Sequence, residues 1–163
     1  MTIKKPLIAA LIVAAGSGER FGHELPKQYQ PLCGAAVLRW SIAAFQNHPL
    51  VSSVHVVIHP DHAALFTTAT EGLTLPPPII GGKTRQDSVR KGLEFLSILK
   101  PDVVLIHDAA RPLVSSQLIT AICEKALETG AATPALAVTD TIKRQHHETL
   151  TTESRENLYT VQT

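Results

Sequence analysis

The sequence predicts an α/β fold, a three-layer α/β/α sandwich built around a mainly parallel sheet. Short apolar runs alternate with stretches of helical periodicity, and several of these runs end in small or polar residues. This alternation predicts parallel strands that are joined by right-handed helical crossovers. The chain has 163 residues, about the size of one domain, and we assign residues 1–163 to a single domain.

Charge and cysteine content exclude several classes of function. The formal net charge is +1, from 15 Lys and Arg against 14 Asp and Glu, so the chain lacks the broad basic surface of a nucleic-acid-binding protein. Cys33 and Cys123 are isolated, which favours two small core residues in a reduced compartment over a metal or redox site. The first apolar run is too short to span a bilayer. We therefore expect a cytoplasmic protein that binds neither nucleic acid nor membrane.

Each expected strand is a short apolar or β-branched run, and each expected helix shows an apolar stripe at intervals of three and four residues. The expected strands are 7–13, 54–58, 79–80, 103–106, 131–138 and 157–161. The expected helices are 36–48, a short helix capped by Asp61 and reaching Phe66, a helix that begins near Thr84, and 117–129 with Ser115 or Ser116 as its cap and Gly130 as its end. The side chains expected to face the core are Val37, Leu38, Ser41, Ile42 and Phe45 in the first helix, Val89, Leu93 and Leu96 in the third, and Leu118, Ile122 and Leu127 in the last.

The first strand leads into a segment that is hard to explain by folding alone. Four of its residues carry little or no side chain: Ala14, Ala15, Gly16 and Gly18. Several N–H groups of such a loop can point at one anion. Arg20 and Lys27 add two cations that suit phosphate oxygens. The spacing fits neither a Walker A loop nor a dinucleotide fingerprint, and G-x-G alone is equally typical of a plain turn.

Two later segments also end strands with polar or glycine residues. Gly82 precedes the expected helix, whose first turn contains Arg85 and Ser88. An arginine at this end of a helix suggests a partner anion or a nucleotide nearby, although a solvated side chain is the alternative. Asp108 follows the strand 103–106, at the sheet edge where open parallel sheets bind ligands. A carboxylate there can hold Mg²⁺ or ribose hydroxyls, or it can be an ordinary turn residue.

Taken together, these segments resemble a known family. The string A-A-G-S-G-E-R-F-G followed by L-P-K-Q-Y resembles the signature loop of nucleotidyltransferases that join a sugar or polyol phosphate to a nucleotide. It is most similar to the loop of the 2-C-methyl-D-erythritol 4-phosphate cytidylyltransferase family. The strings G-G-K-T-R-Q-D-S-V-R-K-G-L, H-D-A-A-R-P and D-T-I-K resemble later segments of that family, in the same order, and the first of them resembles its base-recognition segment. The resemblance implies a Rossmann-like sheet of the nucleotide-diphospho-sugar transferase type.

The resemblance also implies a reaction and roles for single residues. A cytidylyl group would pass from CTP to 2-C-methyl-D-erythritol 4-phosphate, with release of pyrophosphate and with Mg²⁺ as cofactor. Arg20 and Lys27 would be catalytic. The remaining implied nucleotide contacts are Ala14, Ala15, Gly16 and Gly18 for the triphosphate, Gly82, Arg85 and Ser88 for cytosine and its surroundings, and Asp108 for ribose or Mg²⁺.

Residues 139–162 are expected to form a β-hairpin arm. In the resembled enzymes such an arm crosses a two-fold homodimer and carries an arginine into the partner's site, a role that would fall on Arg155. Thr141 and Thr163 match positions at the phosphate of the second substrate. An ordinary exposed hairpin is the alternative.

The domain of the resembled family continues beyond the position of Thr163. We therefore expect a domain truncated at its C-terminus, either a fragment or a protein of impaired activity, and a fused second pathway enzyme also stays open. Two other functions remain open as well. One is a sugar-1-phosphate nucleotidyltransferase that uses another nucleotide, and the other is a non-catalytic nucleotide-binding subunit of the same fold.

Overall fold

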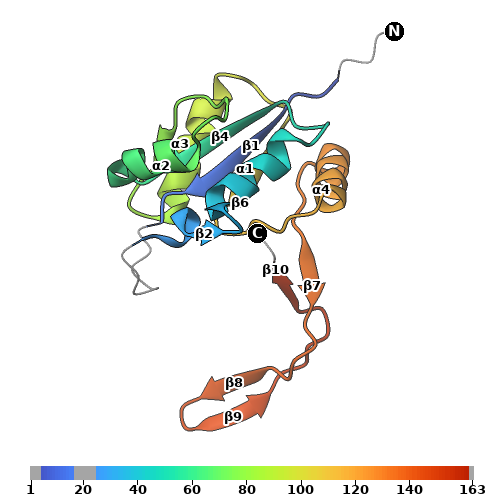
Figure 1. Ribbon diagram of the computed structural model, residues 1–163. Coiled ribbons are helices and arrows are strands. Elements are labelled where there is room, and N and C mark those ends of the chain that lie inside the picture. The colour runs from blue at the N-terminus through green and yellow to red at the C-terminus, as the bar shows by residue number, and fades with distance from the viewer. Residues whose placement is uncertain (1–4, 17–24, 162–163) are drawn as a thin grey trace.

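The computed structural model describes residues 5–16 and 25–161 and places a four-stranded parallel sheet at the centre of an α/β core (Figure 1). The strands are β1 (Ile8–Ala14), β4 (Ser53–Ile58), β5 (Ile79–Ile80) and β6 (Val103–Asp108), in the order β5-β4-β1-β6. All three pairings are parallel, so the carboxyl ends of the four strands lie along one edge of the sheet. The predicted strands of the core are therefore confirmed, each within two residues of its expected bounds.

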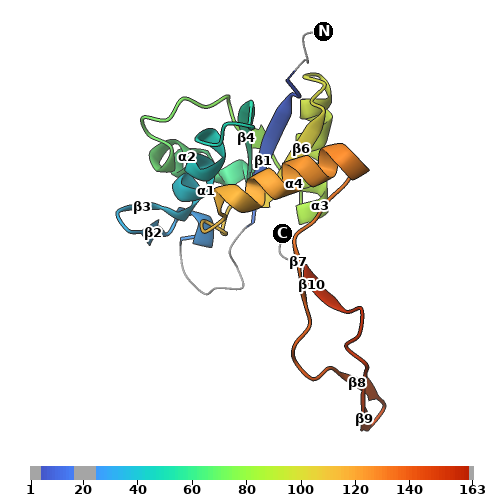
Figure 2. The same cartoon turned by 90° about the vertical axis from the view of Figure 1, so that its right-hand side faces the viewer.

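Helices cover both faces of this sheet and give the predicted three layers (Figure 2). One face of β1 packs against α1 (Val37–Gln46), α2 (Ala63–Ala69) and α4 (Ser116–Thr129). The opposite face packs against α3 (Arg85–Ser97). Gly92 lets α3 approach β1 closely, because a Cβ there would lie 2.6 Å from a methyl carbon of Leu11. No helix in the described part of the chain is long and apolar enough to cross a bilayer.

Four of the five predicted core residues of α1 are buried, Leu38, Ser41, Ile42 and Phe45, and the fifth, Val37, is half-buried. Trp40, near the edge of that stripe, is partly exposed, and its indole N–H donates a hydrogen bond to the carbonyl of Leu32.

The buried faces of α3 and α4 differ from the predicted stripes. In α3 the buried residues are Ser88, Gly92 and Leu96, whereas Val89 is half-buried and Leu93 is exposed. In α4 they are Ile119 and Cys123, whereas Leu118 and Leu127 are exposed and Ile122 packs at the edge of the core. The buried positions 88 and 92 of α3, and 119 and 123 of α4, lie one residue away from the predicted ones. In α3 the shift follows from the close approach of Leu11, which leaves room for only a glycine at position 92.

The helix ends follow local chemistry with one exception. Thr84 and Ser115 accept hydrogen bonds from the backbone of the first turns of α3 and α4, and Gly130 ends α4 at a φ of +86°. Asp61 does not cap the short helix, because the 3-10 turn η3 (Pro60–His62) intervenes and the His59 side chain accepts from the Asp61 N–H. The expectation that Cys33 is a core residue is also wrong: it is exposed, in the turn between β2 (Pro31–Leu32) and β3 (Ala35–Ala36).

The C-terminal part of the described chain forms an arm that extends away from the core in both views (Figures 1 and 2). At its base β7 (Ala135–Ala137) pairs with β10 (Tyr159–Val161), and at its tip β8 (Lys143–His146) pairs with β9 (Thr149–Thr152), both antiparallel. A hairpin is thus present within the predicted range, but the expected strand 131–138 is shorter because only three of its residues pair. All residues of these four strands are exposed.

Candidate active site

The carboxyl edge of the sheet brings three segments together that are far apart in sequence. Ala14 at the end of β1 is in register with Ile58, and Ile58 is in register with Ile80. On the other side of β1, Val13 is in register with Asp108. Neighbouring strands lie about 4.8 Å apart. We call the residues after β1 the first glycine segment (described as far as Gly16) and Gly81 and Gly82 the second. Both segments and Asp108 therefore lie in a row along the edge where parallel sheets bind ligands.

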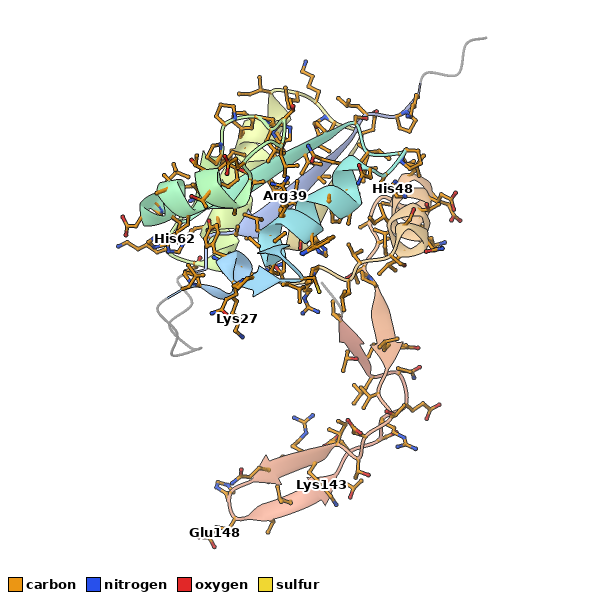
Figure 3. The ribbon with its side chains drawn as sticks, viewed as in Figure 1. Lys27, Arg39, His48, His62, Lys143 and Glu148 are labelled. Atoms are coloured by element: carbon orange, nitrogen blue, oxygen red, sulfur yellow. The ribbon has the colours of Figure 1, made fainter. Side chains whose placement is uncertain are left out.

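The start of the first glycine segment is held by a side chain that the sequence analysis did not select. Gln28 lies in the 3-10 turn η2 (Lys27–Tyr29) and is only 5% exposed. Its amide donates hydrogen bonds of 2.9 Å to the carbonyls of both Ala14 and Gly16. The neighbouring Lys27 is exposed at the lower side of the core, on the side from which the arm extends (Figure 3). Gln28 therefore ties the turn that carries Lys27 to the end of β1.

The signal for Gln28 was present in the sequence. The string L-P-K-Q-Y places an amide with two donors directly after the candidate catalytic lysine. What the string cannot show is that these donors reach back across fourteen residues to the end of the first strand.

Tyr29 anchors the other side of the η2 turn. Its ring is buried and meets the His62 ring edge-on, with the ring centroids 5.5 Å apart. Burial raises the pKa of Tyr29 to about 12, so the hydroxyl stays neutral at physiological pH. The pKa of His62 is lowered, first by burial and then by the neighbouring His59. An aromatic packing contact therefore fixes the turn that bears Lys27.

The second glycine segment is held from both ends. Gly81 donates a backbone hydrogen bond of 2.8 Å to the carbonyl of Ile58. Gly82 donates one of 3.0 Å to the Ser88 hydroxyl, which itself donates to the carbonyl of Thr84 at 2.9 Å. Ser88 is 1% exposed. Its hydroxyl thus supports the loop, and the surface offered to a ligand is that of the loop.

The two glycine segments touch. A Cβ on Gly81 would lie 2.7 Å from the Cβ of Ala15, closer than real Cβ atoms come, so only glycine fits against the first segment. A Cβ on Gly82 would lie 2.4 Å from the Cβ of Asp87. A ligand that rests on one loop is therefore directly beside the other.

Asp108 is the anion that the sequence suggested near Arg85. One carboxylate oxygen lies 2.9 Å from a terminal guanidinium nitrogen of Arg85, and the other lies 3.5 Å from Nε of Arg111. The neighbouring His107 has its Nε2 2.9 Å from the carbonyl of Arg111, and burial lowers the pKa of this histidine. Asp108 therefore joins the start of α3 to the loop after β6.

The described residues fit Mg²⁺ only in a limited way. Within the described ranges, no group of three or more His, Cys, Asp or Glu side chains could hold a metal ion. Asp108 is a carboxylate on the sheet edge, and both of its oxygens contact guanidinium groups. Mg²⁺ commonly keeps several waters and is held by one or two carboxylates together with substrate phosphates. The residues thus suit a magnesium ion that arrives on a nucleotide, with Asp108 as a single protein ligand.

The remaining predicted site residues are not all brought together. Gly18, Arg20 and Thr163 lie outside the described residues. Thr141 and Arg155 belong to the arm, where the Arg155 guanidinium donates to the carbonyl of Thr139. Since the arm extends away from the core, these two positions are not assembled with the glycine segments (Figure 1).

Comparison with known proteins decides which family this geometry belongs to. The family profile described as "IspD: 2-C-methyl-D-erythritol 4-phosphate cytidylyltransferase" matches residues 8–163. The chain belongs to this family. The matched range of this chain contains both glycine segments and the strand that ends in Asp108.

Individual relatives of the IspD family agree with this assignment. The chain is 53% identical over 138 residues to "Bifunctional enzyme IspD/IspF" of Rhodospirillum rubrum, a match that covers 84% of this chain and 36% of that protein. The chain thus spans about a third of the length of the curated relatives it matches. The structure of 4-diphosphocytidyl-2C-methyl-D-erythritol synthase from Anaerococcus prevotii superposes with a TM-score of 0.77 at 26% identity, covering 98% of this chain and 68% of that one. The cytidylyltransferase of Thermus thermophilus superposes with a TM-score of 0.67 at 32% identity, covering 96% and 68%.

A groove of about 840 Å³ lies beside this IspD-type site. The edge of β6, the adjoining face of α4 and residues 130–134 line it, and Arg85 and Arg111 lie along it. Among the described residues, neither glycine segment contributes to the lining of the groove. Its lining is largely apolar, so it is a poor place for a triphosphate.

Proposed function

We propose that this chain binds CTP at the carboxyl edge of its sheet and transfers the cytidylyl group to 2-C-methyl-D-erythritol 4-phosphate. One observation carries the proposal: the two glycine segments of an IspD-family chain touch at Gly81 and Ala15, next to Asp108. Bare backbone on one side suits the triphosphate, and the loop before α3 suits the base. We further propose that the reaction takes place in the cytoplasm, since both cysteines are free.

The proposed step needs no general base. An anionic oxygen of the polyol phosphate attacks the α-phosphorus of CTP, a new P–O bond forms, and the bond from the α-phosphorus to the bridging oxygen breaks. Pyrophosphate leaves with that oxygen and its electron pair. Phosphate monoesters are already largely ionised near neutral pH. What the site must supply is alignment and positive charge.

The residues of this chain divide those tasks. Lys27 supplies positive charge to the α-phosphate, and Gln28 and Tyr29 hold its turn. Arg20, which lies outside the described residues, would supply a second cation from the same loop. Mg²⁺ would neutralise phosphate oxygens of the triphosphate when it is bound. Asp108 would bind ribose hydroxyls or complete the shell of that ion.

We also propose that the acceptor half of the site is formed in a homodimer through the arm. Thr141 and Arg155 would contact the phosphate of the polyol substrate, with Thr163 as a further contact. An isolated two-stranded ribbon is marginally stable in water, so contact with a partner subunit would stabilise the arm. The exposed apolar side chains of the arm offer a surface for such a contact. These side chains are Leu136, Leu150, Leu158, Tyr159 and Val161.

The test is a measurement of pyrophosphate release by the purified protein with 2-C-methyl-D-erythritol 4-phosphate and either CTP or UTP. The proposal predicts turnover with CTP and clear discrimination against UTP, because the two bases differ at the pyrimidine 4-position. Equal use of the two nucleotides would refute the assignment of the Gly82 segment to cytosine. Turnover with a sugar 1-phosphate instead of the polyol phosphate would refute the substrate.

A further inference from the structure

Lys91 holds the second glycine segment. It lies within the string G-G-K-T-R-Q-D-S-V-R-K-G-L, but the sequence analysis assigned it no role. Its ammonium group donates a hydrogen bond of 2.8 Å to the carbonyl of Gly81, ten residues earlier in the chain. The side chain leaves α3 and reaches back to the loop that precedes the helix. Hydrogen bonds from charged donors are about twice as strong as neutral ones.

The partner of Lys91 is unexpected because two carboxylates are close on the same helix. Asp87 lies four residues before it and Glu94 three residues after it, both at spacings that allow ion pairs on a helix. Arg90 instead contacts both, at 3.7 Å and 3.0 Å. Among the described residues Lys91 forms no ion pair with a carboxylate. Its charge is directed to a neutral carbonyl of the loop.

This contact completes a chain of hydrogen bonds that runs through the loop. Lys91 donates to the Gly81 carbonyl, and the N–H of the same peptide unit, which belongs to Gly82, donates to Ser88 at 3.0 Å. Ser88 then donates to the carbonyl of Thr84 at 2.9 Å. Linked hydrogen bonds polarise and strengthen each other, so the charged donor at one end strengthens the whole row of hydrogen bonds.

These hydrogen bonds fix the position of Gly81, the residue of the second glycine segment that lies against the first. Gly81 is enclosed by Ala15 of the first glycine segment, by Ser88 and by the backbone of β4. A shift of the Gly81 carbonyl would therefore change the spacing between the two loops. We propose that Lys91 is a positioning residue that sets this spacing and so tunes affinity for the cytidine nucleotide. The inference rests on the proposed function.

The experiment compares Lys91→Met, Lys91→Arg and the control Lys125→Met in the complete purified polypeptide. Lys125 is a matched control because it is an exposed helical lysine whose contact is an ion pair with Glu128. The loss of one charged hydrogen bond predicts a rise of about tenfold in KM for CTP in Lys91→Met. We expect kcat and the KM for the polyol phosphate to stay within about twofold, because the hydrogen bond from Lys91 to Gly81 acts on nucleotide binding. Lys91→Arg should restore most of the CTP affinity, and Lys125→Met should behave as the unmodified protein.

A second readout does not depend on turnover. Hydrogen exchange of the backbone should become faster in residues 80–84 of Lys91→Met and stay unchanged in β1 and α4. Unchanged exchange in residues 80–84 would show that Lys91 does not fix the loop. Faster exchange with an unchanged KM for CTP would show that fixing the loop does not affect nucleotide binding. Either result would overturn the proposal. Equal losses for both substrates would indicate general damage and also overturn it. If the unmodified protein does not use CTP, the proposed function fails, while exchange still decides whether Lys91 fixes the loop.

Discussion

The α/β core and the hairpin arm hold their residues in different ways. In the core, six of the seven residues of β1 are buried, and side chains from η2 and α3 tie the segments at its carboxyl edge. In the arm, every residue of β8 and β9 is exposed, and within the described part of the chain these two strands pair only with each other. A single chain can therefore fix the segments that we propose bind the nucleotide. The positions of the arm residues Thr141 and Arg155 depend on what the arm contacts.

This difference divides the proposed reaction between two regions. Variants in the core should act on CTP and on the chemical step. Variants in the arm should act on the acceptor phosphate and on assembly. The following changes test that division, from the largest expected effect to the smallest.

Lys27→Ala should lower kcat roughly a hundredfold or more, because in the proposed mechanism it removes the cation that stabilises the charge developing on the α-phosphate. The free energy of unfolding should change by no more than about 0.5 kcal/mol, since Lys27 is exposed. Pyrophosphate release and urea unfolding measure the two quantities. The exposed lysine of α4 provides the control, as Lys125→Ala. Unchanged turnover would remove Lys27 from the mechanism.

Gln28→Leu should lower kcat/KM for CTP by about tenfold or more and destabilise the core by about 1–3 kcal/mol, because two carbonyls lose their donor. Gln28→Glu should be no better, since an ionised carboxylate cannot donate. Gln30→Leu is the matched control, because Gln30 lies just beyond the same turn and its side-chain amide donates to the carbonyl of Leu25, not to the glycine segment. Steady-state kinetics and urea unfolding check the prediction. Equal effects of the Gln28 and Gln30 substitutions would show that the contact with the glycine segment has no special role.

Arg155→Met should raise the KM for 2-C-methyl-D-erythritol 4-phosphate by about tenfold, the effect of one lost charged contact, and leave the KM for CTP nearly unchanged. Arg144→Met is the matched control, because Arg144 pairs within the arm with Glu153 at 2.7 Å. Sedimentation should show the same oligomer for all three proteins. A rise in the KM for CTP would break the proposed division between core and arm.

His55→Gln should make the stability of the core less dependent on pH. His55 is 5% exposed, and burial lowers its pKa below the ordinary value of 6.5. As the pH falls below that value, the unfolded chain takes up a proton that the folded core resists, so stability is lost. The pKa values of His62 and His107 are lowered in the same way, so the substitution should reduce the slope and not abolish it.

Urea unfolding at several pH values between about 5 and 8, where histidine titrates, measures this slope. His146→Gln, on the exposed strand β8, is the control and should leave it unchanged. A slope that is equally steep in His55→Gln and in the unmodified protein would contradict the assignment of the effect to the core.

Local chemistry made much of the fold predictable from sequence. The β-branched runs of β1, β4 and β6 specify strands, and Thr84, Ser115 and Gly130 mark helix ends through their own side chains or backbone freedom. The segments of the site were predictable because they follow the strands β1, β5 and β6. Parallel pairing then places them on one edge.

Contacts that depend on tertiary structure were not predictable. Gly92 marks the buried face of α3 because it packs on Leu11, which no stripe of large side chains reveals. Arg85 finds Asp108 across twenty-three residues. Gln28 and Lys91 act on carbonyls that only the folded chain brings within reach. Sequence patterns describe residues that are neighbours along the chain, whereas these contacts join residues that are neighbours only in space.

A crystal structure of the protein with CTP and Mg²⁺ tests the central claim most directly. We predict the cytosine against residues 81–88, the triphosphate on the loop after β1, and the Lys27 ammonium group within hydrogen-bonding distance of the α-phosphate. A nucleotide bound in the groove between β6 and α4, with Lys27 facing solvent, would contradict the account.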